Sequence, residues 1–198
     1  VAVLEAERIK MIDDRARAIP DCPAVVSSLL GFASGGASPH LNILVELAVS
    51  MRAHGRGGVI LVVPSDSQAW RSSIVEPMAY AVSPMFDGLS DLVARADAER
   101  DTRDWQDEMQ ETVHAIAGLT AVDGATILTD RFELLAFGAK IARREGSPQV
   151  EQAAVSEPVE DGVADVLHPS RLGGTRHLSA AQFVHDQRDS IALVASQD

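Results

Sequence analysis

The feature that most constrains the fold is a continuous apolar run from Gly58 to Pro64, in which β-branched residues predominate. A strand with one wet face alternates apolar and polar residues, so an unbroken run between two chain breakers is typical of a strand buried on both faces. Such a strand needs a covering layer on each side. Amphipathic helical patterns over 88–100 and 104–119 can supply these layers. We therefore expect an α/β fold with a central mixed β-sheet flanked by helices.

The composition narrows the class of protein further. Hydrophobic residues make up 46% of the 198 residues and aromatic residues only 4%, so the core must be built from Ala, Val, Leu and Ile. The net charge of −12 makes nucleic acid an unfavourable partner, although a few arginines in one cleft can still hold a small phosphate ligand. Cys22 is the only cysteine, which favours a reducing, cytoplasmic location. No apolar run approaches the ~20 residues of a membrane-spanning helix.

The pattern along the chain predicts two parts. Apolar residues near a helical spacing in the first 19 residues predict an amphipathic helix, and we assign 1–37 to an N-terminal helical segment. A main domain then covers 38–198, with its first helix starting at Ser38 and Pro39 and stopping in the glycines before Gly58. The chain starts at Val1 and ends just after an apolar run, so we expect it to be part of a longer protein.

The second half of the chain predicts a hairpin, an insertion, a helix and a strand. A strand over 125–129 and a returning strand within 132–141 form the hairpin. Prolines and acidic residues over about 142–171 predict an insertion that leaves the core. Helical spacing resumes over 178–187, and 190–195 predicts another buried strand.

Two short motifs carry candidate chemistry. Asp123-Gly124-Ala125 opens one apolar run and offers a carboxylate beside two small residues. Gly174-Thr175-Arg176-His177 opens a helical pattern, where backbone N–H groups and three donor side chains can hold a phosphate. Taken alone, the first motif is more simply a turn before a strand, and the second an ordinary helix cap with surface side chains.

The two motifs in this order resemble the diadenylate cyclase (DAC) domain, which condenses two ATP into cyclic di-AMP. The resemblance rests on an apolar helix running into Asp-Gly-Ala and a strand, then a hairpin, then Gly-Thr-Arg-His, a helix and a strand that ends at Ser196. It covers the second half of the chain; the residues from Met51 to Pro64 fit it only as a generic helix and strand.

The resemblance implies a role for each motif residue. Asp123 would be the catalytic carboxylate and would bind a divalent metal, Mg²⁺ or Mn²⁺, together with His177. The nucleotide-binding residues would be Gly124, Ala125, Gly174, Thr175, Arg176, His177 and Ser196. Ser196 can equally be a polar strand end. The implied partners are ATP or a cyclic dinucleotide and, for catalysis, a second copy of the chain in a head-to-head dimer or a higher oligomer.

Three departures from the family pattern keep a second hypothesis open. Leu178 stands where the family has a final arginine, Gln197 stands where an acid is usual, and the acidic insertion lengthens the segment between the motifs. Loss of one charge-assisted donor can cost ~10²–10³ in rate. The alternative is a catalytically degenerate sensor domain that binds a nucleotide and signals to a domain outside this chain. A third reading is an α/β interaction domain without a ligand.

Overall fold

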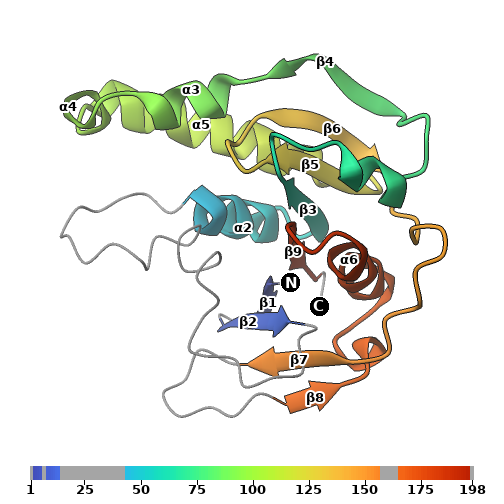
Figure 1. Ribbon diagram of the computed structural model, residues 1–198. Helices are drawn as coiled ribbons and strands as arrows, with labels where there is room; N and C mark the ends of the chain where they lie inside the picture. The colour runs from blue at the N-terminus through green and yellow to red at the C-terminus, as the bar shows by residue number, and fades with distance from the viewer. Residues whose placement is uncertain (1, 6–7, 14–42, 157–164, 197–198) are drawn as a thin grey trace.

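The computed structural model describes residues 2–5, 8–13, 43–156 and 165–196, and they form an α/β fold with one mixed nine-stranded sheet flanked by helices (Figure 1). The strand order is β4-β6-β5-β3-β9-β1-β2-β7-β8. The strands are β1 (Ala2–Glu5), β2 (Arg8–Asp13), β3 (Gly58–Val63), β4 (Tyr80–Phe86), β5 (Ala125–Thr129), β6 (Leu134–Ala139), β7 (Ala153–Ser156), β8 (Asp165–Leu167) and β9 (Ile191–Ala195). The helices are α2 (Ile43–Ala53), η1 (Ala69–Ser73), α3 (Gly88–Ala94), α4 (Asp97–Arg100), α5 (Arg103–Leu119), η2 (Pro169–Arg171) and α6 (Thr175–Asp186).

Strand β3 occupies the position that its continuous apolar run predicts. Every residue of β3 is buried, and the strand pairs in parallel with β5 and antiparallel with β9. Its side chains alternate between two cores because successive residues of a strand point to opposite faces. Ile60 and Val62 pack with α2, α3 and α5, while Leu61 and Val63 pack with η1 and α6. Figure 1 accordingly shows α2 and α6 on opposite sides of the central strands.

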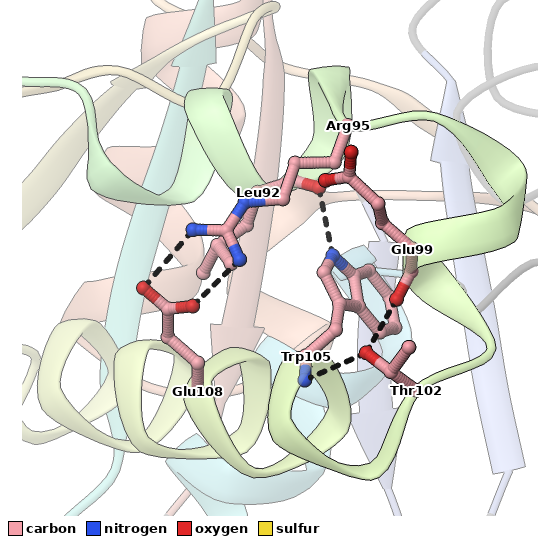
Figure 2. A network of polar contacts seen from close by, with 6 residues as sticks. All are labelled: Leu92, Arg95, Glu99, Thr102, Trp105 and Glu108. Atoms are coloured by element: carbon pink, nitrogen blue, oxygen red, sulfur yellow. Dashed lines mark hydrogen bonds and ion pairs between the residues drawn. The ribbon is translucent and has the colours of Figure 1, made fainter.

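The α3, α4 and α5 segment is held together by polar contacts as well as by apolar packing (Figure 2). The buried indole of Trp105 donates a hydrogen bond to the carbonyl of Leu92 at 3.0 Å. At the surface, the guanidinium of Arg95 forms two hydrogen bonds, of 2.7 and 3.2 Å, with the carboxylate of Glu108. The hydroxyl of Thr102 caps α5 by accepting from the backbone N–H of Trp105. The one helix predicted over 88–100 is thus two helices, separated by extended backbone at residues 95 and 96.

The structure corrects the predictions for two segments, the first 19 residues and residues 142–171. The helix predicted for the first 19 residues is wrong where the structure describes it: β1 pairs in parallel with β9, and β2 pairs with β1. Helical spacing over so short a stretch is ambiguous. Residues 2–5 form a strand because they pair with the edge of β9. The segment 142–171 likewise returns to the sheet, because β7 pairs with β2 and β8 pairs with β7. Ala153 and Ala154 are buried there, so this part of the chain is not an excursion from the core.

A buried carboxylate ties the start of this segment to α6. Asp186 accepts hydrogen bonds from the backbone N–H of Arg144, at 2.8 Å, from the hydroxyl of Ser147 and from the amide of Gln182, at 2.9 Å. With three donors satisfied by one side chain that is 3% exposed, the connection from β6 to β7 is fixed to the end of α6.

Several predicted features lie outside the described residues. These are the helix start at Ser38 and Pro39, the single Cys22, the departure at Gln197, and the parts of the predicted N-terminal segment and insertion within 14–37 and 157–164. Two elements between β3 and α3 were not predicted, η1 and the edge strand β4.

Candidate functional site

The two motifs meet in one cleft of about 560 Å³ at one edge of the sheet. Strands β3 and β5 begin at this edge, whereas β6 and β9 end there, because the second pair runs antiparallel to the first. The N-terminus of α6 closes the same edge. The lining residues are Val59, Asp123, Gly124, Ala125, Ala139, Lys140, Ile141, Gly174, Thr175, Arg176, His177, Ser179, Ala195 and Ser196. Every site residue proposed from the sequence is therefore in the lining.

Gly124, the glycine of the first motif, is required by the fold independently of any ligand. Gly124 has φ +126°, and a Cβ there would lie 2.4 Å from the carbonyl carbon of Gly138 on β6. A side chain is excluded by the neighbouring backbone before any ligand is considered. The close approach brings the turn before β5 against the end of β6 and places Asp123 at the cleft.

The second motif supplies a helix N-terminus that opens into the cleft. Gly174 is the N-cap of α6, and its carbonyl accepts from the backbone N–H groups of His177 and Leu178. The N–H groups of Thr175 and Arg176 come before His177, the first residue whose N–H finds an acceptor in this turn, as the leading N–H groups do at every helix start. Together with the positive end of the helix dipole, they make this point suited to an anion.

His177 is the one buried side chain of this motif, at 5% exposure. Its ring packs against Gly173, where φ is +148° and a Cβ would lie 2.4 Å from Nδ1. Thr175 is exposed and Arg176 is half-buried, and both line the cleft. The residue that follows, Leu178, is half-buried and does not line the cleft, whereas Ser179 does.

Lys140 is the charged site residue that the sequence did not predict. It follows β6, and its Nζ lies 2.5 Å from Oδ2 and 3.2 Å from the backbone oxygen of Asp123. This contact, helped by the charge of Arg176, holds the pKa of the Asp123 carboxyl below its ordinary value. A signal was present, since the chain has only two lysines and one of them stands at the end of the predicted hairpin. The strand register, which the sequence does not state, places that lysine beside Asp123.

The charges of the cleft do not follow those of the whole chain. Among its lining residues, Lys140 and Arg176 are cationic and Asp123 is the anion, so these side chains sum to one positive charge. The protein as a whole has a net charge of −12. A locally positive cleft on a negative protein favours a small anion over a polyanion.

Within the described ranges, no three His, Cys, Asp or Glu side chains cluster as a metal site. Asp123 and His177 are the lining residues of these types. A single carboxylate is a typical protein contribution to a Mg²⁺ ion that is otherwise held by water and substrate phosphates. The donor set thus suits a metal that arrives with a nucleotide, and not one held by protein side chains alone.

Comparison with known proteins gives no family model, curated protein or solved structure that matches this chain. In the part of the chain that the structure describes, none of the helices has the length and apolarity needed to cross a membrane.

Proposed function

We propose that this chain is a diadenylate-cyclase-like domain that binds ATP in the cleft and condenses two ATP into cyclic di-AMP and pyrophosphate. The observation that carries the proposal is that two motifs about fifty residues apart in the sequence line one cleft. Its volume of about 560 Å³ lies in the range typical of small-molecule sites.

The lining contains apolar residues and polar donors, and these two kinds of residue would suit the two halves of a nucleotide. The apolar residues at the strand ends, among them Val59, Ala139 and Ala195, would bound the place of the base and ribose. The start of α6 with Thr175 and Arg176 offers donors for phosphate oxygens. His177 and Ser196 extend the polar side of the lining.

The proposed reaction needs a carboxylate that reaches the ribose. The 3′-oxygen of one ATP attacks the α-phosphorus of the other, so that a new P–O bond replaces the α–β anhydride bond and pyrophosphate leaves. In the second step the 3′-oxygen of the other nucleotide attacks the α-phosphorus of the first, and a second pyrophosphate leaves. Asp123 would accept the 3′-hydroxyl proton. Its side chain is 89% exposed at the rim of the cleft, as is required if a second copy, head to head, presents the other ATP. A divalent metal, Mg²⁺ or Mn²⁺, held by Asp123 and His177, would neutralise phosphate charge.

A sensor without turnover is the second candidate, and two observations favour it. Lys140 is paired with the carboxylate that catalysis needs. Leu178, at the position of the family's last arginine, supplies no charge to the cleft. In this case the cleft would hold ATP or a cyclic dinucleotide and report its occupancy to a domain outside this chain.

One experiment separates the candidates. The purified chain is incubated with ATP and Mg²⁺ or Mn²⁺, cyclic di-AMP is measured by mass spectrometry, and ATP affinity is measured by calorimetry. Asp123→Asn should reduce product at least ~10²-fold, while Asp107→Asn, an exposed acid on α5, should not. ATP binding without product would leave the sensor.

Binding has its own matched pair of variants. Arg176→Ala should weaken ATP roughly 10- to 100-fold, because a charge-assisted hydrogen bond is lost, whereas Arg103→Ala, at the exposed start of α5, should have no effect. If the wild-type chain neither binds ATP nor forms product, both candidates fail.

A further inference from the structure

The position of Lys140 follows from the pairing of β5 and β6. Ala125 stands opposite Ala139 in this antiparallel pair, so the residue after β6 and the residues before β5 reach the cleft together. Lys140 then binds Asp123 through both the carboxylate and the backbone oxygen. The chain's other lysine, Lys10, is in β2, on the far side of β9 and β1 from this hairpin.

The pair that Lys140 forms is easily exchanged. Its side chain is 54% exposed and that of Asp123 is 89% exposed. Ion pairs in such contact with water contribute little to stability, because water and salt screen them and both side chains lose freedom. A lysine on a flexible four-carbon stem can therefore change partners at small cost when a more highly charged anion arrives.

Such an anion would find an excess of positive charge in the cleft. Arg176 and the start of α6 offer one point for a phosphate, and Lys140, the residue after β6, lines the same cleft from a different element. Asp123 alone balances one of these two cations. A ligand with two or more phosphate groups can engage both cationic points, whereas a single phosphate needs only one.

We propose that Lys140 is the second phosphate-binding residue of the cleft, resting on Asp123 and moving to the ligand when a polyphosphate binds. The proposal rests on the function proposed above and adds a residue and a selectivity to it. α6 and Arg176 bind the first phosphate, and Lys140 makes affinity rise with the number of phosphates. Binding also releases the Asp123 carboxylate, so that the group is available only when the ligand is in place.

The first test measures affinity for three probes: ATP, AMP and inorganic tripolyphosphate. Lys140→Met should weaken ATP and tripolyphosphate roughly tenfold and leave AMP within about twofold, since one charge-assisted contact is lost. Lys140→Arg should restore most of the affinity. Arg131→Met, at the opposite end of the same hairpin, removes an equal charge outside the cleft and should change nothing. Thermal unfolding of each variant confirms that the exposed substitutions leave the fold intact.

The second test follows the lysine itself. With ¹³Cε-labelled lysine the chain gives only two lysine signals, and Lys140→Arg identifies which one belongs to Lys140. We expect this signal to shift when Asp123→Asn removes the resting partner, and to shift in the wild type when tripolyphosphate is added. If the Lys140 signal shifts neither with Asp123→Asn nor with tripolyphosphate, the proposed exchange of partners is refuted.

The outcomes separate this proposal from the proposed function. If ATP binds and Arg176→Ala weakens it, but Lys140→Met binds ATP as tightly as the wild type or tighter, the role of Lys140 is refuted and nucleotide binding stands. Equal weakening of AMP and ATP by Lys140→Met would refute the selectivity for polyphosphates. If the wild type binds neither ATP nor tripolyphosphate, both proposals fail.

Discussion

Replacing Gly124 by alanine should destabilise the fold, because the obstacle is backbone and not a movable side chain. The added Cβ would lie 2.4 Å from the carbonyl carbon of Gly138, 2.6 Å from its oxygen and 2.8 Å from the oxygen of Ala139. All three atoms belong to β6, which is held between β4 and β5. The residue must also keep φ near +126°, a conformation that L residues rarely adopt.

The magnitude follows from these two costs. An unfavourable backbone conformation costs roughly 1–3 kcal/mol, and overpacking adds roughly 1–3 kcal/mol. Their sum, roughly 2–6 kcal/mol, is a large share of the ~5–15 kcal/mol that stabilises a typical domain. At about 2–4 °C per kcal/mol for a chain of this length, the midpoint of thermal unfolding should fall by on the order of 10 °C.

The same substitution six residues earlier is the control and should act in the opposite direction. Gly118 is exposed in α5, has no atom within 4 Å of a built Cβ and has no positive φ. Gly118→Ala should raise the free energy of unfolding by roughly 0.5–1 kcal/mol through helix propensity. Thermal and urea unfolding followed by circular dichroism measures both variants. A Gly124→Ala variant with the wild-type midpoint would refute the close approach of the two strands.

Three further predictions test other contacts. Trp105→Phe should cost roughly 1–3 kcal/mol of unfolding free energy in urea melts, because the buried carbonyl of Leu92 loses its donor (Figure 2). Asp186→Ala should cost roughly 3 kcal/mol or more by the same measurement, because it leaves three donors without their acceptor; a midpoint equal to that of the wild type would contradict this. In a ¹³C-carboxyl titration, Asp123 should titrate below its ordinary pKa, and Lys140→Met should raise that pKa towards 3.8. Because the pKa is lowered in the folded state, the ion pair stabilises the fold at pH values above 3.8. This stabilisation is lost as the pH falls through the folded-state pKa.

The sequence predicted those parts of the fold that depend on local pattern. The run from Gly58 to Pro64 contains β3 (Gly58–Val63), an interior strand in which every residue is buried, and the apolar spacing of 104–119 corresponds to α5. Both signals are strong because the pattern extends over a whole element and ends at clear breakers. The hairpin of β5 and β6 and the last strand, β9, are confirmed for the same reason.

Non-local pairing explains the parts that were missed. Strands β1 and β7 are four residues each, too short for periodicity to distinguish strand from helix. Their conformation is set by partners far away in the chain: β9 for β1, and β2 for β7. Lys140 was missed for a related reason, since its partner is 17 positions away and only the register of β5 and β6 places the two side chains together.

The same register changes what Leu178 implies about the cleft. From the sequence, Leu178 stands where the diadenylate cyclase motif that this segment resembles has its last arginine, so the motif carries one cation less. In the structure, position 178 is outside the lining, and Lys140 contributes a cation from a different strand. Polyphosphate binding is therefore compatible with Leu178, because the number of cations that face a ligand depends on the topology and not on the motif alone. If the chain is the cyclase proposed above, the absence of that arginine would affect the geometry of catalysis more than affinity, since a flexible lysine attracts a phosphate without fixing its orientation as an arginine does.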